Sequence, residues 1–350
     1  MDLDTLLLSR IQFGFTVGFH ILFPTLTIGL AVFLAVVEAL WLKTKNRAYL
    51  RLYRLWSRIF ALGFGMGVVS GIVLSYQFGT NFSRFSEITG PVIGPLLAYE
   101  VLTAFFVEAG FIGIMLFGWD KVGPRLHFVA SLLVAIGTTN SAFWILSANS
   151  FMHTPQGVEW IDGRLVPVDR FAVVFNPSFP YRLAHMLLAS IITSSLVVAA
   201  VSAGWVRHLT FKSAGLPGLK IALTVLALVT PLQILVGDLH GLNVQKHQPV
   251  KIAAMEGLWE TRAGAPLLLF AWPDQKAETN HFEIGIPKPA SVILQHHPDG
   301  VVKGLNEVRP EDRPPVLPVF WSFRVMVGLG FWFLLLGFTG VFLWWRGSLE

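Results

Sequence analysis

"IQFGFTVGFHILFPTLTIGLAVFLAVVEALWL", residues 11–42, is an almost unbroken apolar run, longer than the ~20 residues that a helix needs to cross a bilayer. Because it is so long and has no small-residue cleavage site at its end, we do not expect it to be a signal peptide. The chain therefore opens with a membrane helix. Further apolar runs follow at residues 57–78, 95–118, 128–148, 184–205, 219–239 and 323–345. Together they predict an all-α fold, a polytopic transmembrane bundle of seven spans.

The composition supports a membrane protein. Of the 350 residues, 54% are hydrophobic and 13% are charged, whereas soluble domains average about 25% charged residues. The net charge of +5 does not indicate a nucleic-acid partner, because the basic residues lie at the ends of the spans. The absence of cysteine excludes disulfides, thiolate-bound iron–sulfur clusters and covalently attached c-type haem. Noncovalent cofactors held by His or Met remain compatible with the sequence.

Charges in the connections predict the orientation. The first connection carries only basic residues, the third and fifth are also basic, and the second and fourth are balanced; the first holds Lys43, Lys45, Arg47, Arg51, Arg54 and Arg58. The positive-inside rule then places the N-terminus outside. We expect three parts: helices one to six (1–239), a large outer loop (240–322) and a seventh helix (323–350). In the outer loop, the proline- and charge-rich stretches 287–300 and 309–318 are expected to be irregular.

Two candidate haem ligands share one predicted depth. His185 opens the fifth span and Met326 opens the seventh, so both are expected near the outer surface. An imidazole and a thioether at one level can supply both axial ligands of a low-spin haem. Arg324 and Arg10, at the outer ends of the seventh and first spans, would offset the haem propionates. The alternative is that the histidine is merely interfacial and the methionine packs.

His20 lies about ten residues into the first span, within "FTVGFHILFPTLTIG" (15–29). A lone histidine in an apolar helix either bonds a neighbouring helix or binds a metal, and the sequence leaves both open.

Two glutamates interrupt the third span, in "YEVLTAFFVEAGF" (99–111). At helical pitch, Glu100 and Glu108 would lie about 80° apart around the axis and ~12 Å apart along it. Keeping an ionised carboxylate at bilayer depth costs at least ~2.5 kcal/mol. Asp120 closes the third span on the inner side, and Ser141 of the fourth span is expected near the depth of Glu108. These groups predict a proton path rising from the inner face toward the outer half. The alternative is a structural hydrogen bond between helices.

In the outer loop, "HQPVKIAAMEGLWET" (247–261) predicts a short amphipathic helix. Its Lys251 and Glu256 could hold and deprotonate a polar ligand at the membrane surface, although a solvated charge pair is the ordinary alternative.

The sequence closely resembles subunit I of the cytochrome bd-type quinol oxidases. The resemblance is carried by blocks spread in order along the chain: "LSRIQFGFTVGFHILFPTLTIGL" (8–30), "YEVLTAFFVEAGFIGIMLFGWDKV" (99–122), "TTNSAFWILSANSFMHTPQG" (138–157), "AHMLLAS" (184–190), "GDLHGLNVQKHQPVKIAAMEGLWET" (237–261) and "FWSFRVMVGLG" (320–330).

This resemblance implies roles for the same residues. His185 and Met326 match the axial ligands of the low-spin haem b, and His20 matches a ligand in the oxygen-reducing haem pair. Lys251 and Glu256 match the quinol-oxidation site of the outer loop, which the family calls the Q-loop. The remaining matches are with acidic and hydroxyl residues of the proton supply (Glu100, Glu108, Ser141, Asp120) and with haem-contacting arginines (Arg10, Arg324).

The resemblance also implies an activity. Such a subunit transfers electrons from ubiquinol or menaquinol to O2, reduces it to water, and generates a proton gradient because the two half-reactions are placed on opposite sides. Its implied partners are a second membrane subunit (subunit II), a small single-helix subunit and the lipid bilayer. Its implied location is the cytoplasmic membrane of a bacterium or archaeon, with the Q-loop outside.

One departure concerns the oxygen-reducing site. The family continues beyond the seventh span, through a "GRQPW"-type motif near a glutamate that ligates the high-spin haem b, and nothing up to Glu350 matches it. A second and a third haem (b and d, or b and b) are therefore expected, but the residue that would ligate one of them is not found in this sequence.

Two other functions remain as alternatives. A haem-free proton-coupled transporter would use Glu100 and Glu108, but we see no internal repeat of the kind such folds carry. The second alternative is a family member that binds the low-spin haem but does not reduce oxygen by itself.

Overall fold

The computed structural model describes residues 4–207 and 212–349. Within these residues, seven helical segments are long and apolar enough to cross a membrane: Thr5–Thr44, Arg47–Thr80, Ser83–Phe117, Pro124–Phe151, Arg170–Val206, Lys212–His247 and Pro310–Trp345. Each contains one of the predicted apolar runs, so the predicted number and order of spans are confirmed. The side of the membrane that each end faces stays a prediction.

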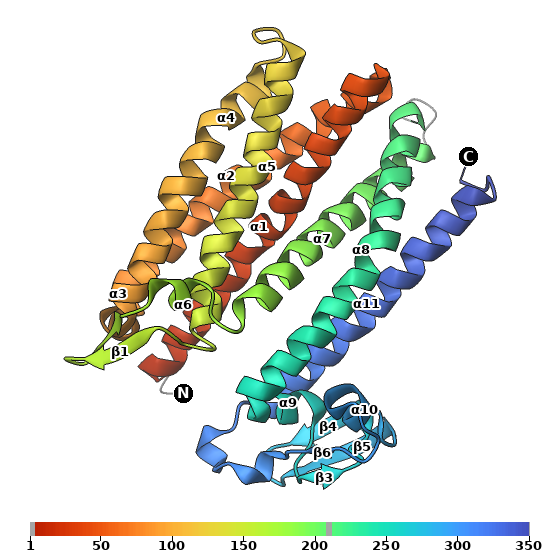
Figure 1. Cartoon of the computed structure of the whole chain (residues 1–350). Helices are drawn as coiled ribbons and strands as arrows, with labels where there is room; N and C mark the ends of the chain where they lie inside the picture. Colours follow the sequence, from red (N-terminus) through yellow and green to blue (C-terminus); the bar gives the residue numbers. More distant parts are fainter. Residues whose placement is uncertain (1–3, 208–211, 350) are drawn as a thin grey trace. The chain divides into compact units, whose positions relative to one another are not determined.

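The chain forms two compact units, Met1–Thr230 with Leu336–Glu350, and Pro231–Leu335. In the first unit, α1 packs against α2, α5 and α7, and α5 packs against α4, as Figure 1 shows. The elements that lie wholly in this unit are α1 (Thr5–Thr44), α2 (Arg47–Thr80), α3 (Ser83–Glu100), the π-helical turn η1 (Val101–Phe105), α4 (Phe106–Phe117), α5 (Pro124–Phe151), β1 (Val158–Ile161), β2 (Arg164–Pro167), α6 (Arg170–Val174) and α7 (Phe179–Val206).

Local sequence explains where these helices begin and end. The Asp4 carboxylate accepts a hydrogen bond from the Leu6 N–H and caps α1, and the Asn46 amide oxygen does the same for α2 through the Ala48 N–H. Between them, Lys45 takes a left-handed conformation (φ 56°) and its N–H bonds the Trp41 carbonyl. This single residue closes α1 and lets the chain reverse directly into α2.

The main core of the first unit is formed by α1 and α2 together with buried residues of α4, α5, α7 and α8 (Lys212–His247). Leu34 of α1 and Tyr53, Trp56 and Phe60 of α2 are fully buried. On other faces of α2, large apolar side chains such as Leu62 are mostly exposed. An apolar exterior of this kind suits hydrocarbon, not water.

The second unit holds the outer-loop region. Its elements are α9 (Pro249–Glu256), β3 (Arg262–Ala263), β4 (Leu267–Asp274), β5 (Thr279–Ile286), α10 (Pro289–Gln295), β6 (Val301–Val302) and the short 3-10 turns η2 (Leu305–Glu307) and η3 (Pro310–Asp312). Strands β4 and β5 pair antiparallel, and β3 pairs with β6. The long helices α8 (Lys212–His247) and α11 (Val316–Trp345) contribute to both units.

Two expectations of irregular structure were wrong. Residues 309–318 contain the turn η3 and the first residues of α11, which begins at Val316. Residues 287–300 were expected to be irregular, yet Pro289–Gln295 is helical, with proline in the first turn where its missing N–H costs nothing. Ser291 is buried in this helix; its hydroxyl donates to the Gly300 carbonyl and accepts from the Ala265 N–H, both at 2.7 Å. Nearby, the hydrogen-bonded Lys288 ammonium lowers the pKa of the Asp299 carboxyl.

Candidate functional site

A π-helical turn, η1, lies between the two glutamates of the third span. A π turn holds about one residue more than an α turn, so the eight residues from Glu100 to Glu108 rotate about as far as seven α-helical ones. That rotation of ~700° leaves the two carboxylates only about 20° apart around the axis. The expected separation of ~80° was therefore wrong, because it assumed regular α-helix.

Both glutamates face α5. The Ser141 hydroxyl donates to Glu100 Oε1 at 2.7 Å. Glu108 is buried, with 6% of its surface exposed, and lies against Gly137, where an added Cβ would come within 2.7 Å of the Glu108 Cγ. Gly137 and Ser141 are four residues apart and so share a face of α5. The structure thus brings together three of the predicted proton-path residues.

Thr103, inside the π turn, belongs to the same contact and was missed from the sequence. Its hydroxyl accepts hydrogen bonds from the Asn140 amide at 2.9 Å and from the Trp144 indole at 2.8 Å. It also donates to the Tyr99 carbonyl at 2.7 Å. These bonds fix the turn to α5. A threonine in an apolar run carries no distinguishing signal, which is why the sequence did not reveal it.

Asp120, the fourth predicted member of the path, lies apart from this cluster. It is exposed in the turn between α4 and α5. Twelve residues separate it from Glu108, which corresponds to roughly 18 Å along a helix. Any link between the two needs intermediate groups.

His20 is held by a neighbouring helix. Its Nδ1 lies 2.9 Å from the Ser70 hydroxyl oxygen of α2. That hydroxyl also lies 2.8 Å from the Met66 carbonyl. The bond occupies His20 Nδ1 and leaves Nε2 outside it, an arrangement typical of histidines that bind a metal through the other ring nitrogen. Gly71 gives the ring room, since an added Cβ there would lie 3.2 Å from its Cε1.

The two predicted ligands of the low-spin haem fall in different compact units. His185 is half-buried in α7, and Met326 is 49% exposed on α11, in the second unit. Their pairing stays a prediction. Arg182, three residues before His185 on the same helix, donates to Asn149 at 2.9 Å. Its buried Nε has no hydrogen-bond partner among the described residues.

In the second unit, Arg324 contacts Glu256. The guanidinium donates to Glu256 Oε2 at 2.7 Å, and both side chains are about nine-tenths buried. The Arg324 Nε also bonds the Leu268 carbonyl of β4. Glu256 is the last residue of α9, which Gly257 ends in a left-handed conformation (φ 64°). Lys251 is half-buried on the same short helix but five residues earlier, about 140° around its axis.

Arg10, the other predicted haem-contacting arginine, is exposed in the second turn of α1. It is not brought against the remaining site residues by any contact that the structure describes.

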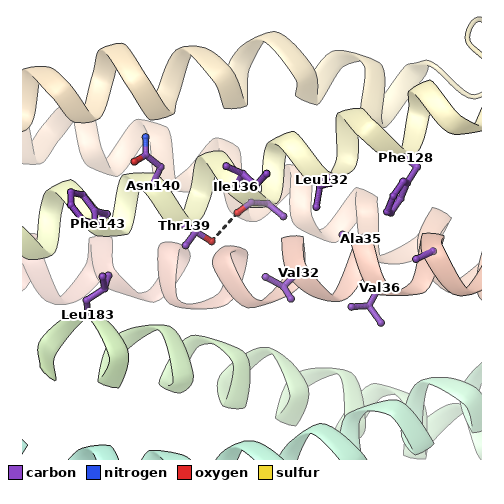
Figure 2. Close-up of a pocket in the computed structure, with 12 residues that line it drawn as sticks. Val32, Ala35, Val36, Phe128, Leu132, Ile136, Thr139, Asn140, Phe143 and Leu183 are labelled. Carbon is purple, nitrogen blue, oxygen red and sulfur yellow. Dashed lines mark hydrogen bonds between the residues drawn. The ribbon is translucent and has the colours of Figure 1, made fainter. Parts of the chain in front are cut away.

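An apolar pocket of ≈ 610 Å³ opens along α1, α5 and α7. Figure 2 shows that Thr139 and Asn140 are the polar members of its lining. The Thr139 hydroxyl donates to the Ala135 carbonyl at 2.9 Å, and the Asn140 amide donates to Thr103. Since both are engaged elsewhere, this pocket suits hydrocarbon and is distinct from the carboxylate cluster.

A family model described as cytochrome bd terminal oxidase subunit I matches residues 8–349. The chain belongs to this family. It is 37% identical over 363 residues to "Cytochrome bd ubiquinol oxidase subunit 1" of Bacillus subtilis, covering 99% of this chain and 76% of the relative. It is 36% identical over 316 residues to "Cytochrome bd-II ubiquinol oxidase subunit 1" of Escherichia coli, covering 89% of this chain and 61% of that relative.

The fold agrees with the family. The structure of bd oxidase from Geobacillus thermodenitrificans aligns with a TM-score of 0.90 at 33% identity, covering 99% of this chain and 78% of that one. The resemblance found in the sequence is therefore confirmed. This chain is a multi-pass membrane protein of a family of oxidoreductases that oxidise quinol in respiratory electron transport.

Proposed function

We propose that this chain is the haem-binding, quinol-oxidising subunit of a bd-type oxidase that passes electrons from quinol to O2 and reduces it to water. The observation that carries the proposal is the His20 imidazole, whose Nδ1 bonds Ser70 while Nε2 stays outside that bond and is placed as a metal ligand would be.

The haem-binding residues are proposed as follows. His20 ligates a haem of the oxygen-reducing pair, and His185 with Met326 ligates the low-spin haem b. Bound haem supplies one-electron storage and oxygen binding. Near His185, the half-buried Arg182 cation suits a haem propionate, because its buried Nε has no partner among the described residues. Further haems, b and d or b and b, belong to the proposal without an assigned second ligand.

Quinol oxidation is proposed for the second unit, in the outer loop 240–322. There, Glu256 accepts a quinol proton and Lys251 binds the quinol head. Arg324 keeps the carboxylate in one orientation through its bond of 2.7 Å. This contact supports a role for Arg324 in positioning Glu256 more directly than a role in binding a haem propionate. Arg10 is proposed for the propionates.

Proton delivery is proposed for the α3–α5 contact. Glu108 and Glu100 lie on one side of their span, and the Ser141 hydroxyl already bonds Glu100. Two carboxylates and a hydroxyl on one face can hand a proton along the helix. Asp120 is the proposed entry at the other end of α4. Because protons are consumed from the inside and released from quinol outside, a gradient forms without a pump.

The assembly is part of the proposal. The chain works with a second membrane subunit, subunit II, and with a small single-helix subunit, in a bacterial or archaeal cytoplasmic membrane. The basic connection between α1 and α2 faces inward and the Q-loop faces outward.

The test is a reduced-minus-oxidised absorption spectrum of the purified chain, with haem extracted and quantified per protein. Oxygen uptake with ubiquinol and menaquinol analogues is measured on the assembled oxidase. We expect a b-type signal that is lost in His185→Ala and Met326→Ala, and quinol-dependent oxygen uptake. A folded chain without haem would overturn the oxidase and favour a proton-coupled transporter. Haem without oxygen uptake in the assembled complex would indicate a member that does not reduce oxygen.

A further inference from the structure

A second buried acid–base pair lies in the first unit, away from Glu100 and Glu108. Glu38 of α1 and His127 of α5 are both fully buried, and Glu38 Oε1 lies 2.6 Å from His127 Nδ1. Each sits near the end of its helix: Glu38 six residues before α1 ends at Thr44, and His127 in the first turn of α5. Neither residue belongs to the site predicted from the sequence.

Aromatic and hydroxyl groups enclose this pair. The Tyr53 hydroxyl of α2 hydrogen-bonds the Ser131 hydroxyl at 2.5 Å, and the Tyr53 ring packs edge-on against His127 with centroids 5.6 Å apart. The Trp119 ring lies over the His127 imidazole with centroids 3.9 Å apart. On Trp119 in turn lies the Arg54 guanidinium, 5.5 Å from the ring centroid. Thus the titratable groups that face the pair are Tyr53 directly and Arg54 across an indole ring.

The charge of the pair is uncompensated in one of its states. Neutral His127 beside ionised Glu38 buries one negative charge, whereas one added proton makes the pair neutral, as an ion pair or as two neutral groups. The Glu38 Oε2 and His127 Nε2 atoms are buried and have no hydrogen-bond partner among the described residues. A purely structural link between helices would satisfy these atoms. Groups left open in this way can take up and release a proton.

Helix α5 joins the pair to the carboxylate cluster. His127, Ser131 and Thr138 are buried at helical spacings of four and seven residues, which places them on one face. Gly137, where Glu108 rests, follows His127 by ten residues, ~15 Å along the helix. At the other end, Trp119 adjoins Asp120, which is exposed.

We propose that Glu38 and His127 form a proton-storing pair between the Asp120 end of the bundle and Glu108. The pair with one buried negative charge takes a proton from water at the Asp120 end and becomes neutral. It then releases that proton along α5 toward the Glu108 carboxylate, which rests about 80° around the helix from His127, and regains its charge. This inference rests on the proposed function, which requires protons to enter from this end.

The test compares Glu38→Gln and His127→Gln with Glu87→Gln, an exposed glutamate in an ion pair with Arg84. Glu38→Gln keeps the shape and a hydrogen bond to His127 but cannot ionise. Infrared spectra of the full chain in nanodiscs are recorded from pH 5 to 9. We expect one component of the titrating carboxyl bands, present in the wild type and in Glu87→Gln, to be missing from Glu38→Gln and shifted in His127→Gln, while the components of Glu100 and Glu108 remain. A wild-type spectrum that Glu38→Gln leaves unchanged would overturn the proposal.

A second readout uses the assembled oxidase. We expect Glu38→Gln to slow steady-state oxygen uptake by about tenfold or more, with haem content and the first electron transfer from quinol unchanged. Wild-type rates in this variant would refute the storage role while leaving the oxidase intact. A wild-type complex without quinol-dependent oxygen uptake would instead refute the proposed function, whatever the infrared band does.

Discussion

The hydroxyl of Ser70 bonds His20 Nδ1 and leaves Nε2 as the nitrogen that can bind a metal. Ser70→Ala removes this hydrogen-bond partner at 2.9 Å, so the ring can rotate. We expect the affinity of the His20 site for haem to fall by about 10- to 100-fold, the usual effect of removing a hydrogen-bond partner of a ligating histidine. The measurement is haem content per protein during dilution into haem-scavenging apoprotein. Ser75→Ala is the control, since Ser75 lies on the same helix and bonds only the Gly71 carbonyl.

Gly137 is needed for the position of Glu108. In Gly137→Ala the new Cβ would lie 2.7 Å from the Glu108 Cγ, so one side must move. We expect a destabilisation of about 1–3 kcal/mol from overpacking, together with slower oxygen uptake. The thermal unfolding midpoint and the rate are both measured. Gly113→Ala is the control, because its added methyl meets nothing within 4 Å. If the unfolding midpoint and the rate fell as much in this control, the contact with Glu108 would not be the cause.

Arg324 and Glu256 are buried together, so removing one leaves the other charge uncompensated. We expect Arg324→Gln to destabilise the second unit by about 3–5 kcal/mol and to slow quinol oxidation. Stopped-flow reduction by quinol measures the rate of quinol oxidation. Resistance of the outer loop to protease measures the stability of the second unit. Arg309→Gln serves as the matched control, because Arg309 bonds Glu311 and Asp312 at the surface. Equal effects in both variants would contradict a specific role for Arg324.

The π turn η1 sets how the third span presents its glutamates. Deleting Leu102 would convert the turn to regular α-helix and rotate Glu100 by ~100° relative to Glu108. We expect loss of the Ser141–Glu100 bond and oxygen uptake slower than in Ser141→Ala, which removes that bond without rotating the helix. Oxygen uptake at equal haem content is the measurement. A deletion variant as fast as Ser141→Ala would show that the shared face is unimportant.

These helices differ in how far the sequence could foresee them. The seven spans follow from the length of the apolar runs alone, because a helix that crosses a bilayer must be both apolar and about 20 residues long. The π turn could not be foreseen, since its residues Val101–Phe105 are ordinary helix formers in a membrane and the extra residue is set by packing on α5. Helix α10 was missed because its flanking prolines and histidines outweighed a short apolar stretch, Ala290–Leu294, that packs into the second unit.

The candidate site shows the same limit across longer separations. Depth predicted Ser141 near the level of Glu108, with Glu100 farther out, whereas the Ser141 hydroxyl bonds Glu100. The ion pair between Glu256 and Arg324 joins residues 68 positions apart in the chain and required the fold. The Glu38–His127 pair was overlooked because a single carboxylate near a basic helix end looks like an ordinary surface charge.

The direction in which the whole molecule crosses the membrane decides whether Glu38 and His127 can be supplied with protons from inside. The chain contains no cysteine, so a single introduced thiol reports one position without background. Lys45 is exposed between α1 and α2, and Glu159 is exposed in β1 after α5. Three spans separate them, which places them on opposite sides of the membrane.

We expect a membrane-impermeant maleimide to label Glu159→Cys in intact cells and Lys45→Cys only after permeabilisation. This follows from the basic excess around Lys45, which favours retention inside. The cysteine-free wild type is the background control. Labelling of Lys45→Cys in intact cells, with Glu159→Cys protected, would reverse the topology. It would put the Glu38–His127 pair on the side where quinol protons are released, and the proposed inward supply of protons would then fail for the whole molecule.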